Sequence, residues 1–102
     1  MEIVINCKYG GYGLSEKAME LFIEKKEAGK DKGKYKLNKN GFDIYLSPEE
    51  ERADPDLVSV VRELGQASWG RSARLKIFDV PHECNWDIEE IDGWEALRLW
   101  TR

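Results

Sequence analysis

Hydrophobic and polar residues alternate along the chain with two periodicities, one typical of strands and one typical of helices. Apolar, mostly β-branched residues fill Glu2–Cys7 and glycines follow at once, which indicates a largely buried strand. From Ala73 to Val80 hydrophobic and other residues alternate with period two until Pro81, so we expect a second strand with one face toward water.

Two segments carry the start and stop signals of helices. Ser15 is a good N-cap ahead of an apolar stripe at helical spacing, and Gly29 supplies a left-handed stop. The second helix begins at Asp54, which caps it, with Pro55 at the first helical position, and it ends at Gly65.

Two pairs of turn residues predict β-hairpins. Asn40-Gly41 and Asp92-Gly93 each stand between alternating hydrophobic segments, and both dipeptides favour a type I′ turn. The second hairpin has a competitor, because Trp94–Trp100 contains good helix formers and a helix there is the alternative. The predicted order is β-α-β-β-α-β-β-β, with a C-terminal β-hairpin. We therefore expect an α+β fold, an antiparallel-rich sheet with two helices packed on it.

Length and charge restrict what this fold can do. The 102 residues suffice for a single compact domain over residues 1–102, and so short a chain gains from forming a homo-oligomer. A formal net charge of −4 argues against binding polymeric nucleic acid. No apolar run is long enough for a membrane span and Met1–Asn6 does not read as a secretion signal, so we expect no membrane partner and a cytoplasmic location.

Groups that could perform catalysis or hold a metal are scarce. His82 is the only histidine, and Cys7 and Cys84 are the only thiols, so a zinc site would need every soft ligand in the chain. We interpret both cysteines as reduced, buried side chains. The glycines of Tyr9–Gly13 invite comparison with phosphate-binding loops, but no lysine follows the last glycine, which favours a tight turn. We expect no catalytic residue, no metal and no cofactor.

Residues that suit a nucleotide are better represented. Aromatic or guanidinium planes bind a base, and cations or amides bind phosphates. The candidate ligand-binding residues are Arg52, Trp69, Arg71, His82, Asn85 and Arg102. The alternative is that the arginines are ordinary solvated charges and that the tryptophans pack within hairpins or at an interface.

Several blocks of sequence stand out together. They are Ile3–Ser15, Arg52–Val58 with Val60–Gly65, Gly70–Ile77 with Pro81, and Trp86–Glu90 with Asp92-Gly93. In this order, and over a large part of the chain, they resemble a family of small bacteriophage proteins, the Thoeris anti-defence proteins of the first type.

The resemblance implies that the protein is a sponge. Proteins of this family bind the cyclic ADP-ribose signal made by a TIR-domain defence enzyme and keep it, uncleaved, from its effector. Some assemble as hexamers and also hold cyclic oligonucleotides. We therefore expect non-catalytic sequestration of a cyclic nucleotide immune signal in the host bacterial cytoplasm, by a dimer or a hexamer. The alternative is a protein–protein inhibitor of a host defence enzyme that acts through an aromatic and acidic surface.

The same resemblance suggests roles for individual residues. Arg102 aligns with an arginine near the end of the family pattern and is expected to contact phosphate or base. Arg52 and Arg71 match arginines of the motifs, and His82 and Asn85 fall in a variable turn where polar contacts to the ligand are expected. Where this chain has a serine at position 72 the family pattern has an aromatic residue, so Trp69 or Trp100 would stack on the base instead.

Overall fold

The elements of the chain follow the predicted order. A computed structural model describes residues 1–28, 35–38, 41–44 and 51–102. The elements are β1 (Glu2–Asn6), α1 (Glu16–Glu27), β2 (Tyr35–Asn38), β3 (Gly41–Ile44), α3 (Pro55–Leu64), the 3-10 helix η1 (Gly65–Ser68), β4 (Leu75–Asp79), β5 (Cys84–Ile91) and β6 (Trp94–Thr101). The prediction of an α+β fold with a C-terminal hairpin is confirmed. No described helix is both long and apolar enough to cross a bilayer.

The predicted helix caps are present at the residues that signalled them. The Ser15 hydroxyl accepts a hydrogen bond from the amide of Ala18 at 3.1 Å. Asp54 accepts from the amide of Asp56 at 2.8 Å, and Pro55 follows it at the first helical position. Gly65 ends α3 with a positive φ of 56°. The stop predicted at Gly29 lies outside the described residues.

Every described strand pair is antiparallel, and the strands form three separate ladders instead of one continuous sheet. The ladders are β1 with β4, β2 with β3, and β5 with β6. Positive φ angles at Asp92 (51°) and Gly93 (90°) suit the predicted type I′ turn between β5 and β6. The alternative of a helix over Trp94–Trp100 is therefore wrong. Of the other predicted turn, Gly41 opens β3 and residues 39–40 lie outside the described part.

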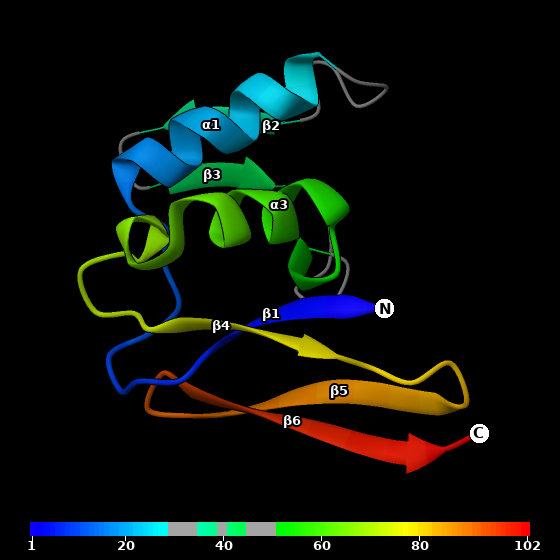
Figure 1. The fold of residues 1–102 in the computed structure, drawn as a ribbon. Helices are drawn as coiled ribbons and strands as arrows, with labels where there is room; N and C mark the ends of the chain where they lie inside the picture. Colours follow the sequence, from blue (N-terminus) through cyan, green and yellow to red (C-terminus); the bar gives the residue numbers. More distant parts are fainter. Residues whose placement is uncertain (29–34, 39–40, 45–50) are drawn as a thin grey trace.

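Strand β1 lies in the middle of the molecule and is buried on both faces. Figure 1 shows α1 and α3 on one side of the β1–β4 ladder and the β5–β6 hairpin on the other. Val4 packs into the helical core with Phe22 and Leu57. Ile3 and Ile5 point the opposite way, into a second cluster that includes side chains of the hairpin. A strand covered on both faces needs the uninterrupted apolar run seen in the sequence.

The two helices are also joined by a buried ionic contact. Lys26, near the end of α1, places its ammonium 2.5 Å from a carboxylate oxygen of Asp54 and 2.9 Å from one of Asp56. Only 5% of the Lys26 side chain and 7% of the Asp54 side chain are exposed, so this pair is shielded from solvent, whereas Asp56 is 41% exposed. The ionic contact fixes the end of α1 against the start of α3.

Candidate anion-binding site

Three loops meet at one end of the molecule. They are the loop after β1 (residues 7–13), the loop between η1 and β4 (residues 69–74) and the β5–β6 turn (residues 92–93), which gather at the left of Figure 1. The amide of Gly70 donates to the carbonyl of Gly13 at 2.9 Å, and that of Gly10 donates to Asp92 at the same distance. A Cβ at Gly70 would lie 2.8 Å from backbone of Gly13, so glycine is needed for this approach.

Asn6 ties the three loops together from below. Its side-chain amide nitrogen donates to the carbonyls of Lys8 at 2.9 Å and Gly93 at 2.7 Å. Its side-chain oxygen accepts from the amide of Arg74 at 2.9 Å. The residue is fully buried, and its own amide donates to the Glu95 carboxylate at 2.8 Å. One side chain at the end of β1 therefore sets the backbone positions of Lys8 and Arg74.

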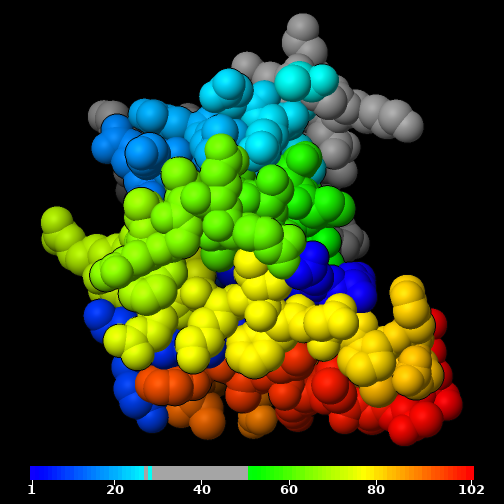
Figure 2. Space-filling view, in the orientation of Figure 1, coloured from blue at the N-terminus to red at the C-terminus, as the bar shows by residue number. Residues whose placement is uncertain are grey.

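A cationic hollow of about 360 Å³ opens between two of these loops. Its described lining consists of Lys8, Gln66, Trp69, Gly70, Arg71, Ala73 and Arg74. None of these residues is acidic, although the whole chain carries a formal net charge of −4. In Figure 2 the yellow-green segment after α3 projects at the left edge, above the blue residues that follow β1. The negative chain thus presents a locally positive surface.

An aromatic ring stands beside these cations. Trp69 is half-buried, packs against the helical core and pairs with Leu14 through an isolated bridge, so its position is fixed by the fold. The Arg74 guanidinium carbon lies 5.8 Å from the centre of the Trp69 ring, within the range of a cation–π contact. Because the Lys8, Arg71 and Arg74 side chains are exposed, they are accessible to an anion at the same place. The arrangement suits a ligand with both phosphate and a planar ring.

The six candidate residues from the sequence divide among three places. Trp69 and Arg71 line the hollow together. Arg52 does not reach it. That residue is buried, its guanidinium forms an ion pair with Glu95, and its guanidinium carbon stacks 3.4 Å from the centre of the Tyr12 ring. We therefore leave Arg52 out of the candidate site and assign it to the interior.

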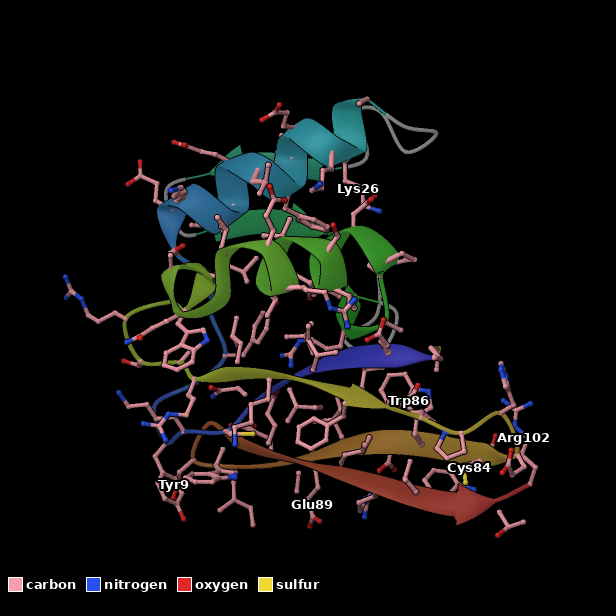
Figure 3. The ribbon with its side chains drawn as sticks, in the orientation of Figure 1. Tyr9, Lys26, Cys84, Trp86, Glu89 and Arg102 are labelled. Atoms are coloured by element: carbon pink, nitrogen blue, oxygen red, sulfur yellow. The ribbon has the colours of Figure 1, made fainter. Side chains whose placement is uncertain are left out.

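The other three candidates lie at the opposite, open end of the β5–β6 hairpin. The amide of Arg102 donates to the carbonyl of Glu83 at 3.0 Å, and Asn85 is paired with Trp100 across the ladder. His82 is exposed in the turn that precedes β5. Figure 3 shows Arg102 and Cys84 at this end and Tyr9 at the other. His82, Asn85 and Arg102 are thus neighbours, but they do not join Trp69 and Arg71.

Two cations of the hollow, Lys8 and Arg74, were missed in the sequence. Lys8 follows the end of β1 and Arg74 precedes the start of β4, positions where side chains are usually assigned to solvent. The register of β1 with β4 joins them, since the amide of Cys7 donates to the carbonyl of Arg74 at 2.7 Å and so extends the ladder by one bond. The signal that could have found them was the pairing of these two strands.

A free thiol, that of Cys7, lies at this end of the molecule. Cys7 adjoins Lys8, but burial raises the pKa of its thiol, which disfavours the reactive thiolate. Among the described residues, no three His, Cys, Asp or Glu side chains form a group that could hold a metal ion.

The chain matches no protein-family model, no curated protein and no solved structure. The geometry of the hollow is therefore the basis for the functional proposal.

Proposed function

We propose that this protein binds a small phosphate-bearing nucleotide in the cationic hollow and holds it without breaking its bonds. The observation that carries the proposal is the convergence of Lys8, Arg71 and Arg74 around Trp69, with no acidic residue in the described lining. Anionic phosphate oxygens would accept hydrogen bonds from the cations, and the base would lie on the indole or on a guanidinium plane.

Rough magnitudes indicate that all of these contacts are needed. A hydrogen bond to a charged group contributes about 1.5 to 3 kcal/mol, and a base stacked on an aromatic ring about 1 to 3 kcal/mol. Association itself costs at least about 4 kcal/mol in lost translational and rotational freedom. One cation alone does not offset that cost. Three such contacts and one stacked base together contribute about 5.5 to 12 kcal/mol, which exceeds the lower end of the cost.

The resemblance to the Thoeris anti-defence proteins suggests which nucleotide this is. It would be a cyclic ADP-ribose isomer, or a cyclic oligonucleotide, and the protein would meet it in the cytoplasm of the host bacterium. Sequestration would then keep the signal from its effector and inhibit the anti-phage defence. Both ligand types carry phosphates and planar bases, which are the two groups that the hollow suits.

Capture and release give a direct test. The protein is incubated with each cyclic ADP-ribose isomer and with cyclic oligonucleotides, freed of unbound ligand and heated, and the supernatant is analysed by chromatography and mass spectrometry. The proposal expects one ligand to be recovered intact in stoichiometric amount. Recovery of a changed ligand would mean an enzyme, and no recovery of any of them at micromolar protein would refute the proposal.

Arginine variants then locate the site. Arg71→Ala and Arg74→Ala are each expected to weaken capture by about tenfold or more, the loss of one charge-assisted contact. Arg62→Ala is the matched control, because Arg62 is an exposed arginine of α3 that pairs with Glu2 outside the hollow. Arg102→Ala tests the competing site at the open end of the hairpin. Loss of capture in that variant alone would move the site there.

A second candidate function has one observation in its favour. Large apolar side chains remain exposed on the hairpin and the glycine loop, among them Tyr9, Ile91, Trp94 and Trp100. Exposed aromatic residues are enriched where proteins bind each other, so an inhibitor that blocks a host defence enzyme is the alternative. Such an inhibitor would impair a purified defence enzyme in the absence of any nucleotide, whereas a sponge would act only by removing the signal.

A further inference from the structure

The β5–β6 hairpin has an outer face that no described part of the chain covers. Glu95 and Leu97 of β6 point inward, where the first is buried and the second packs against the Ile3 cluster. Strand alternation therefore sends the intervening residues outward. This outer face consists of Trp94, Ala96, Arg98 and Trp100 on β6 and their partners Ile91, Glu89, Asp87 and Asn85 on β5. In Figure 3, Glu89 points away from the rest of the molecule.

Apolar groups concentrate at the turn end of this face. Ile91 is 62% exposed and Trp94 43%, and Tyr9 of the glycine loop packs on Trp94 with the ring centres 5.0 Å apart. A shallow hollow of about 170 Å³ lies among them, also lined by Glu89 and Ala96. Exposed aromatic and aliphatic side chains grouped in this way are typical of a surface that binds a protein.

Opposite charges lie side by side near the middle of the same face. Asp87 and Arg98 are direct partners across the ladder, joined by two hydrogen bonds of 2.6 and 2.7 Å. Both remain partly exposed, Asp87 at 32% and Arg98 at 55% of the side chain. One strand therefore presents a negative charge and its neighbour a positive charge at the same height. A surface with this arrangement can be complementary to itself.

We infer that the outer face of the hairpin is covered by a second copy of this chain, packed face to face about a two-fold axis that runs along the strands. This axis places β5 of one copy over β6 of the other. Each Asp87 then faces an Arg98 of the other copy, and each Ile91 faces a Trp94. The alternative two-fold axis runs perpendicular to the strands, at the height of the Asp87–Arg98 pair. It would place β5 over β5 and bring Asp87 against Asp87 and Arg98 against Arg98, and such repulsion costs free energy. Charge thus selects one of the two symmetric arrangements.

The size of the face determines how tight such a dimer is. It comprises one hairpin of two eight-residue strands with Tyr9 at its edge, which is a small area for a protein interface. We therefore expect a concentration-dependent dimer and not an obligate one. Burial of Ile91, Trp94 and Tyr9 supplies most of the stabilisation, and the charges fix the orientation. The inference is independent of the nucleotide proposal, because it rests on another surface.

Charge reversal tests both the face and the orientation. Asp87→Arg places two arginines opposite each other at both contacts of the proposed dimer, and Arg98→Asp places two aspartates there. Each variant alone is expected to raise the dimer dissociation constant by about tenfold or more, since like charges across an interface are repulsive. A 1:1 mixture of the two variants is expected to dimerise again, because every contact then joins an arginine to an aspartate.

Sedimentation velocity over a range of concentrations measures the outcome, and circular dichroism verifies that each variant is folded. A substitution that only disturbs the hairpin of its own chain is not rescued by mixing, so dimerisation of the mixture distinguishes an interface from such damage. Three results would overturn the inference. They are a wild-type protein that stays monomeric at all concentrations, single variants that dimerise like the wild type, and a mixture that stays monomeric. If the wild type is monomeric, the outer face of the hairpin would instead be a surface for a different protein.

Discussion

Asn6 is the residue whose replacement tests the architecture of the loops most sharply. In Asn6→Ala the carbonyls of Lys8 and Gly93 and the amide of Arg74 all lose the partner that the side chain now provides. These groups belong to three different loops, so no single movement can satisfy them again. The variant is therefore expected to lose stability and, because Lys8 and Arg74 are no longer fixed, also affinity for the nucleotide.

The contacts give the expected magnitude. The bond to Gly93 is buried, and an unsatisfied buried polar group costs about 1 to 3 kcal/mol. The bonds to Lys8 and Arg74 are partly exposed, so water can replace some of each, and they add about 0.5 to 1.5 kcal/mol apiece. We expect Asn6→Ala to lower the free energy of unfolding by about 2 to 6 kcal/mol, a large part of the roughly 5 to 15 kcal/mol typical of a small domain.

Urea denaturation followed by tryptophan fluorescence measures the effect. Asn6→Asp is a second test variant. It keeps the side-chain volume and the acceptor for the amide of Arg74, but it places an oxygen where the nitrogen of Asn6 donates to the carbonyls of Lys8 and Gly93. It should be at least as unstable as Asn6→Ala. Asn85→Ala is the control, an asparagine of the outer hairpin face, expected to change stability by less than about 0.5 kcal/mol. If Asn6→Ala unfolds within about 0.5 kcal/mol of the wild type, the reasoning about the loops is refuted.

Three further changes probe other parts of the fold. Lys26→Met should destabilise the protein by about 3 to 5 kcal/mol in urea denaturation, because Asp54 and Asp56 lose a buried cation. Lys25→Met is the control: it removes the partly exposed ion pair with Glu63 and should cost less than about 1 kcal/mol. Burial raises the pKa of the Glu51 carboxyl above its ordinary value of 4.5, so the folded state binds its proton more tightly than the unfolded state does. Glu51→Gln should therefore raise the melting temperature at neutral pH, and this gain should vanish as the pH falls below about 4.5, where the carboxyl is protonated in both states; a gain that is independent of pH would contradict that cause. Gly70→Ala should destabilise by more than about 1 kcal/mol in the same denaturation assay, because the added methyl meets backbone of Gly13, and unchanged stability would show that the two loops can separate freely.

Local signals in the sequence were sufficient to predict the helix starts and the C-terminal hairpin. Ser15 and Asp54 predicted both helix starts because a cap depends on the few residues beside it. Asp92-Gly93 likewise predicted the C-terminal hairpin, although Trp94–Trp100 contains good helix formers. Pairing across the ladder overrode that local preference, as tertiary context commonly does. The division into three ladders depends on long-range pairing of β1 with β4, which no local pattern encodes.

The candidate site was only partly predictable, for the same reason. Trp69 and Arg71 share one loop, so a local reading could group them. Lys8 joins them from a segment far away in the sequence, through the backbone contacts that Asn6 and the glycines permit. Arg52 shows the converse, since an arginine beside a helix start was predicted to bind a ligand, with a solvated charge as the alternative, but it is buried against Glu95 in the fold. Burial of a charge depends on a partner that folding supplies.

A crystal structure of the protein with the nucleotide that it captures would test the proposed function most directly. We predict ligand phosphates within hydrogen-bond distance of Lys8, Arg71 and Arg74, with the base against Trp69 and all ligand bonds intact. A ligand bound beside Arg102 at the open end of the hairpin, or one found cleaved, would contradict the proposal.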